Sequence, residues 1–109
     1  MSTLSTHVLD TCNGKPAAGM RVTLSRNGQL LRDLTTNEDG RCDGPLLADE
    51  DFAPGIYELR FFVRNYFEGL GTPCPFLEEV PIVFSTVGQQ SHHVPLLCSP
   101  WSYSTYRGS

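Results

Sequence analysis

The amino-acid sequence predicts a small all-β protein in which seven or eight short strands close one β-sandwich, with one short helix. Residues 20–25 alternate apolar and polar side chains, as a half-buried strand does, and Asn27-Gly28 then supplies the left-handed dihedrals of a tight hairpin turn. Ten glycines and eight prolines favour many short elements joined by tight turns. A chain of 109 residues supplies one hydrophobic core, so we expect residues 1–109 to form a single domain.

The first half of the chain continues with a return strand and two loops. Residues 30–36 form the second strand of the hairpin and end at the turn 37–40, whose glycine tolerates a positive φ. Arg41 follows at once, so we expect it at the edge of a strand or loop. The acidic run 49–51 is typical of a solvated loop.

The second half of the chain contains the remaining strand patterns and the helix. Pro81 cannot donate a hydrogen bond to a sheet, so its strand belongs at an edge or a bulge. Residues 65–70 can form one or two helical turns before Gly71 and Pro73 end the helix. Apolar residues at alternate positions, and β-forming aromatics at the end, predict strands over residues 56–63, 80–84, 91–98 and 103–106.

The charge and the N-terminus of the chain exclude several classes of partner. The formal net charge is −4 at pH 7, whereas a nucleic-acid partner or an anionic membrane requires a concentrated basic surface. The first seven residues lack the basic and apolar parts of a secretory signal, and no apolar run approaches membrane-spanning length. We therefore expect a cytoplasmic protein that binds neither nucleic acid nor membrane.

The four cysteines do not have the spacing of a metal site or a redox pair. They are widely scattered, and no two form a C-x-x-C motif. We interpret them as reduced thiols, although their even number would permit two disulfides in an exported protein. The four positions are Cys12, Cys42, Cys74 and Cys98.

Two histidines and one arginine are candidate site residues. His7 and His93 lie on the less apolar side of their predicted strands, where a single histidine is most often a surface group. Metal binding is a poor alternative, because no carboxylate or cysteine stands at ligand spacing beside them. Arg41 is either a solvated charge or, if it points into a pocket, a planar guanidinium group that binds carbonyl or anionic oxygen atoms through two hydrogen bonds. Fingerprints of a nucleotide cofactor or a serine nucleophile are absent from the sequence.

Four motifs, taken in order, resemble one known family, the transthyretin-like hydrolases that act on 5-hydroxyisourate. They are Leu4-Ser-Thr-His-Val-Leu9, followed by Gly14-Lys-Pro-Ala17; Thr36-Asn-Glu-Asp-Gly-Arg41; His93-Val-Pro-Leu-Leu97; and the terminal Ser104-Thr-Tyr-Arg-Gly-Ser109. The resemblance covers essentially the whole chain. It implies a transthyretin-like (prealbumin-like) sandwich and a homotetramer, a dimer of dimers, with active sites in a channel between the dimers.

The resemblance also implies the residues of the site. His7, Arg41 and His93 would be catalytic, and the tail Tyr106-Arg107-Gly108-Ser109 would bind the substrate together with His7 and Arg41. Many members of the family carry a His-x-His arrangement on the penultimate strand, and here Ser91 stands at the first of those positions, with His92 in the middle. His92 points to the opposite side of the strand from His93, so no role is transferred to it.

The implied reaction opens the ring of 5-hydroxyisourate to 2-oxo-4-hydroxy-4-carboxy-5-ureidoimidazoline in urate degradation. Such a hydrolysis requires a base for water and donors for the oxygen that becomes anionic. We expect His7 or His93 to be the base, Arg41 and Arg107 to orient and stabilise the oxygens, and Tyr106 and Ser109 to complete the hydrogen bonds. No cofactor is expected, because the substrate is already an oxidised electrophile.

Two functions of other classes compete with hydrolysis. Transthyretin itself carries thyroid hormone in the channel of a similar tetramer, and fold resemblance alone cannot separate a carrier from an enzyme. A hormone channel is largely apolar, whereas the candidate residues here are polar and charged. A general immunoglobulin-like interaction module gives no reason for the chain to end in Tyr-Arg-Gly-Ser.

Overall fold

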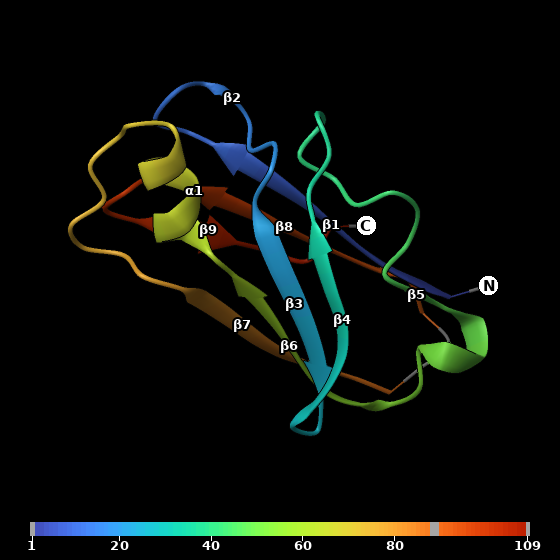
Figure 1. Cartoon of the computed structure of the whole chain (residues 1–109). Helices are drawn as coiled ribbons and strands as arrows, with labels where there is room; N and C mark the ends of the chain where they lie inside the picture. The colour runs from blue at the N-terminus through green and yellow to red at the C-terminus, as the bar shows by residue number, and fades with distance from the viewer. Residues whose placement is uncertain (1, 88–89, 109) are drawn as a thin grey trace.

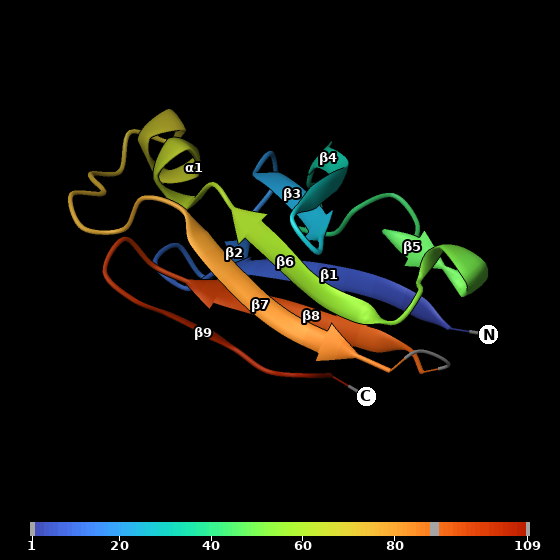
Figure 2. The same cartoon turned by 90° about the horizontal axis from the view of Figure 1, so that it is seen from below.

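The computed structural model of the chain describes residues 2–87 and 90–108, and places them in two packed sheets (Figures 1 and 2). We call the two layers the first sheet and the second sheet. The first sheet has the order β2 (Lys15–Pro16), β1 (Thr3–Asp10), β8 (His92–Cys98) and β9 (Tyr103–Thr105), with β5 (Leu47–Ala48) also paired to β1. The second sheet has the order β4 (Gln29–Thr35), β3 (Arg21–Arg26), β6 (Gly55–Phe61) and β7 (Val80–Thr86).

The predicted all-β sandwich is confirmed, with some changes in its elements. Within the described residues there are nine strands rather than seven or eight, because β2 and β5 are two-residue strands that add to the edge of β1. The acidic loop 49–51 closes into a single 3-10 turn, η1 (Asp49–Asp51). The predicted helix is α1 (Val63–Gly69), which starts two residues early because Val63 is buried with Tyr66 and Phe67.

The hairpin that the sequence indicated most clearly joins β3 to β4. Asn27 and Gly28 both take positive φ, 50° and 86°, as a two-residue hairpin turn requires. The strand that contains Pro81 is β7, which is an edge strand of the second sheet, as predicted.

The core lies between the sheets and follows the period of two in each strand. In β1, every second side chain is buried from Leu4 to Asp10, and the intervening ones face outward and are half-buried. Fully buried apolar side chains come from both sheets and include Leu4, Val8, Leu24, Tyr57, Leu59, Phe61 and Leu96. In the described ranges, no helix is long and apolar enough to cross a membrane.

One buried polar group ties α1 to the end of β1. Asp10 is 1% exposed, and its carboxylate accepts hydrogen bonds from the Tyr66 hydroxyl at 2.8 Å and from the Asn13 side chain at 2.8 Å. Burial alone raises the pKa of Asp10, but the hydrogen bonds from Asn13 and Tyr66 outweigh it and leave that pKa below its usual value. Burial and the neighbouring carboxylate raise the pKa of Tyr66.

Candidate active site

The two candidate histidines lie on the same outer face of the first sheet. β1 and β8 run parallel, with Ser5 opposite His93 and His7 opposite Pro95. His7, Ser5 and His93 are all half-buried and all point away from the core, because they occupy the outward positions of their strands. The predicted sides of both histidines are therefore confirmed.

Arg41 reaches the same face through the turn that precedes it. The amide of Val8 donates to the carbonyl of Gly40 at 2.8 Å, and Arg41 pairs with His7 as an isolated antiparallel bridge. Gly40 has a φ of 73°, and a Cβ there would lie 2.4 Å from the carbonyl oxygen of Val8. Only glycine allows this approach, so the turn fixes exposed Arg41 beside β1.

The rings of the two histidines are held by different partners. His7 Nε2 lies 2.9 Å from the carbonyl oxygen of Asp39, and since a carbonyl only accepts, Nε2 donates. His93 Nδ1 lies 2.9 Å from the hydroxyl of Ser5, which can donate or accept. Burial, followed by the positive charge of Arg41 and then His7, lowers the pKa of His93. His93 is therefore a neutral imidazole near pH 7, as a general base must be.

The chain tail extends the edge of the first sheet as far as His93. The hydroxyl of Thr105 donates to the carbonyl of Pro95 at 2.7 Å, and the amide of Gly108 donates to the carbonyl of His93 at 2.6 Å. A Cβ on Gly108 would lie 2.9 Å from His93 Cδ2, so the glycine packs directly on the ring. Ser109, also predicted to bind substrate, lies outside the described residues.

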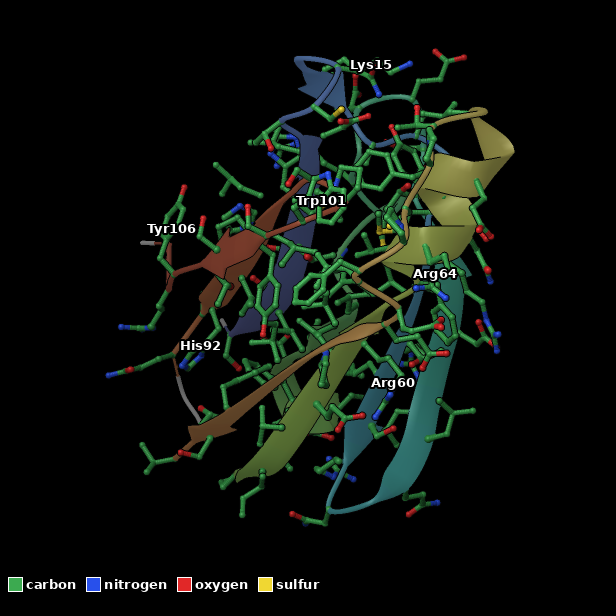
Figure 3. The ribbon with its side chains drawn as sticks, turned by 90° about the vertical axis from the view of Figure 1, so that its left-hand side faces the viewer. Lys15, Arg60, Arg64, His92, Trp101 and Tyr106 are labelled. Carbon is green, nitrogen blue, oxygen red and sulfur yellow. The ribbon has the colours of Figure 1, made fainter. Side chains whose placement is uncertain are left out.

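The other two tail residues form no hydrogen bond or ring contact with His7 or His93 among the described residues. Tyr106 is 60% exposed, and Figure 3 places it on the opposite side of the molecule from Arg60 and Arg64. Arg107 Nη2 donates to the side-chain oxygen of Gln90 at 3.3 Å and to the carbonyl of Ser91 at 3.4 Å. Tyr106 and Arg107 line a groove of about 280 Å³ between β7 and the tail. Their predicted contact with substrate stays a prediction.

His92 lies on the core side of the first sheet, as the alternation predicted. It is 9% exposed and packs against the rings of Phe52, at 5.6 Å, and Phe84, at 6.1 Å, between centroids. His92 and His93 thus have opposite environments although they are neighbours in the sequence.

Two contacts at the site were not predicted from the sequence. The hydroxyl of Ser5 and the carbonyl of Asp39 hold the two histidine rings, and both depend on segments far apart in the chain. For metals, no group of three or more His, Cys, Asp or Glu side chains within residues 2–87 and 90–108 could hold an ion. The four cysteines are free thiols, of which Cys74 and Cys98 are buried.

Nearly the whole sequence matches one protein family. The model of the HIUase/Transthyretin family aligns with residues 4–108. The chain belongs to this family. The 5-hydroxyisourate hydrolase of Mesorhizobium japonicum is 51% identical over 97% of this chain and 91% of its own length. The 5-hydroxyisourate hydrolase of Mus musculus is 47% identical over 99% of this chain and 96% of its own.

Solved structures share the fold over nearly the whole chain. Klebsiella pneumoniae 5-hydroxyisourate hydrolase has a TM-score of 0.89 and 39% identity, with 100% of both chains covered. Sea bream transthyretin, solved in complex with thyroxine, has a TM-score of 0.89 and 26% identity over 97% of this chain and 94% of its own. (S)-allantoin synthase has a TM-score of 0.95 and 44% identity, and the chain spans 44% of that longer protein. The predicted resemblance and transthyretin-like fold are confirmed.

Proposed function

We propose that this protein is a hydrolase that opens the ring of 5-hydroxyisourate to 2-oxo-4-hydroxy-4-carboxy-5-ureidoimidazoline in urate degradation. One observation carries the proposal: a histidine with a lowered pKa, His93, shares an outer face with His7 and with an arginine that forms no ion pair among the described residues. A neutral base beside a free cation is the arrangement that amide hydrolysis requires. The names of its bacterial and mouse relatives point to the same substrate.

In the proposed mechanism, His93 acts on water and Arg41 acts on the substrate. The water oxygen bonds to a ring carbonyl carbon while His93 takes one proton from the water. The carbonyl oxygen becomes anionic, and the Arg41 guanidinium stabilises it. The ring C–N bond then breaks, and the nitrogen receives the proton from His93, so that a carboxyl group and a ureido group remain. This reaction needs no redox step and no cofactor.

His7 takes a second role in this proposal. Its Nε2 is engaged with the carbonyl of Asp39, which leaves Nδ1 as the nitrogen with a lone pair. His7 also pairs with Arg41 along the backbone, so it can orient the substrate next to the guanidinium. The tail residues Tyr106, Arg107, Gly108 and Ser109 are proposed to bind the substrate's remaining polar groups.

Hormone transport is the less suitable function for this face. A carrier site for a mainly apolar ligand is lined mostly by apolar side chains. The outer face of β1 and β8 instead presents His7, Arg41 and His93. The similarity to transthyretin, at 26% identity, supports the shared fold and not a shared ligand.

We further propose that the protein works in the cytoplasm as a homotetramer, a dimer of dimers, of this one-domain chain. β7 and β9 end their sheets on the same side, where they line the groove beside the tail. Phe76 and Trp101 stack at 6.4 Å while 65% and 62% exposed. Unpaired strand edges and exposed aromatic pairs are typical of surfaces that another copy covers. Sedimentation equilibrium should therefore give four chains per particle, whereas a monomer at assay concentration would contradict the assembly.

The activity itself is tested with freshly made substrate. Urate oxidase generates 5-hydroxyisourate, and its decay is followed by ultraviolet absorbance with and without this protein. We expect decay that accelerates in proportion to protein concentration. Decay at the spontaneous rate, with folded protein present, would overturn the proposed function.

A further inference from the structure

The ring of His93 is held from two sides by residues far from it in the sequence. Ser5 stands opposite His93 in the parallel pairing of β1 with β8, and its hydroxyl lies 2.9 Å from Nδ1. On the other side, Gly108 donates its amide to the His93 carbonyl at 2.6 Å. An added Cβ at Gly108 would lie 2.9 Å from Cδ2 and 3.1 Å from Cβ of the ring residue. The ring is therefore confined between a hydroxyl and a bare backbone.

This confinement leaves one ring nitrogen free. Nδ1 is occupied by the hydroxyl of Ser5, and no described residue forms a hydrogen bond with Nε2. A neutral imidazole carries its proton on one nitrogen and its lone pair on the other, and the partner of the first decides which is which. If Ser5 accepts a hydrogen bond from Nδ1–H, the lone pair is at Nε2, where water can reach it.

His7 does not have an equivalent arrangement. Its Nε2 must donate to the Asp39 carbonyl, so the free lone pair of His7 is on Nδ1, the nitrogen nearer its own backbone. The two histidines therefore present different nitrogens to the outer face. Within an imidazole ring Nε2 lies further from the Cβ atom than Nδ1 does, so the free nitrogen of His93 is at the outer end of its side chain and is the better placed of the two to contact water on a substrate.

We propose that Ser5 is a positioning residue for the hydrolysis. Its hydroxyl accepts a hydrogen bond from Nδ1–H of His93 and, with Gly108 against the ring, fixes Nε2 as the basic nitrogen. This inference rests on the proposed function for its kinetic part only. The tautomer of His93 is a property of the folded protein and exists without any substrate.

The test compares Ser5→Ala and Ser5→Thr with a matched control on the same face. Thr3 is two residues before Ser5 on β1, and its hydroxyl lies 3.3 Å from the hydroxyl of Ser91, the residue just before β8. Thr3→Val removes that hydroxyl without touching a histidine. For each variant we would measure kcat and KM, and the imidazole ¹⁵N shifts of His93 that report which nitrogen carries the proton.

We expect Ser5→Ala to lower kcat about tenfold with little change in KM, the scale on which an orienting partner of histidine acts. In that variant the ¹⁵N shifts should move toward the Nε2–H tautomer. Ser5→Thr keeps a hydroxyl at this position, so it should keep the Nδ1–H tautomer and most of the kcat that Ser5→Ala loses. Thr3→Val should match the unmodified protein in both measurements.

Two results would overturn the inference. An Nε2–H tautomer in the unmodified protein, or unchanged ¹⁵N shifts in Ser5→Ala, would mean that Ser5 does not set the proton's position. An equal loss of kcat in Thr3→Val would mean that the hydroxyls only support the strand pair. If the unmodified protein shows no hydrolysis, the proposed function fails while the ¹⁵N shifts still decide the role of Ser5.

Discussion

The outer faces of both sheets carry charged side chains, but Arg21 and Arg60 on one face have different partners from Arg41 on the other. On the second sheet, Arg21 pairs with Asp33 at 2.8 Å, and Arg60 pairs with Glu58 at 3.1 Å and with Glu79 at 3.0 Å. On the first sheet, Arg41 lies beside two histidines, and none of these three has a carboxylate partner in the part of the chain described.

This difference separates ordinary surface from a candidate site. Exposed ion pairs such as Arg21 with Asp33 are solvated, and they contribute little to stability. Burial is the largest cause of the lowered pKa of His93, and the nearby positive charge of Arg41, which no carboxylate offsets, lowers that pKa further. Such clustering does not stabilise the fold, but it can stabilise the negative charge that develops on a bound substrate.

The largest effect should follow from removing the proposed base. His93→Asn keeps a polar side chain of similar width but has no basic nitrogen, so kcat should fall by about 100-fold or more, the range of general base catalysis. The melting temperature should stay close to that of the unmodified protein, because His93 faces outward and is half-buried. Unchanged turnover in this variant would remove His93 from the mechanism.

The charge of Arg41 should also be visible in the pH dependence. Arg41 helps to lower the pKa of His93, so neutralising it in Arg41→Gln raises that pKa. The acid limb of kcat/KM follows protonation of the base in the free enzyme, so this limb should move to higher pH. A limb that stays in place, or moves to lower pH, would show that the two groups are not coupled.

The turn that delivers Arg41 offers a structural test with a matched control. Gly40→Ala places a Cβ 2.4 Å from the Val8 carbonyl, whereas Gly44→Ala, at a similar φ of 77°, meets nothing within 4 Å. Both variants carry the strain of a positive φ, about 1 kcal/mol or more, in the free energy of unfolding. Only Gly40→Ala should also displace Arg41 and lose activity. Equal activity in the two variants would show that the turn at Gly40 is not needed to place Arg41 in the active site.

A smaller effect, on stability alone, is expected at the buried end of β1. Tyr66→Phe leaves the carboxylate of Asp10 without one of its donors, which should lower the free energy of unfolding by about 1–3 kcal/mol. The pKa of Asp10 is lower in the folded protein than the unfolded value of 3.8. The stabilisation that ionised Asp10 adds to the fold is therefore complete above pH 3.8, and it is lost as the pH falls through the pKa of the folded state. Acid titration of the variant should therefore unfold it at higher pH, with hydrolysis at pH 7 unaffected.

Much of this arrangement could be predicted because a strand has a period of two. Alternation alone placed His93 outward and His92 inward, and the glycine of the 37–40 turn placed Arg41 at an edge. The family resemblance supplied the grouping of these residues. Alternation could not supply the register between β1 and β8, which pairs Ser5 with a histidine 88 residues away.

Other features depended on tertiary contacts that no local pattern encodes. The early start of α1 follows from the burial of Val63 against the core, which overrides the propensity of the segment. The direction of Arg107 follows from the segment just before β8, where Gln90 and Ser91 accept its hydrogen bonds. Neighbouring residues of the tail therefore lie in different places: Gly108 packs on His93, and the side chain of Arg107 points toward the edge of the sandwich.

The central claim is that the outer face of the first sheet, where Arg41 lies beside His7 and His93 without an ion pair among the described residues, is the working site, and one measurement tests it most directly. We would compare kcat/KM for 5-hydroxyisourate in Arg41→Gln and in Arg60→Gln, which make the same substitution on the two outer faces. Arg41→Gln should lose about 100-fold or more, the effect of removing a group that stabilises developing charge, and Arg60→Gln should match the unmodified protein. Equal losses in the two variants, or no loss in either, would contradict the account.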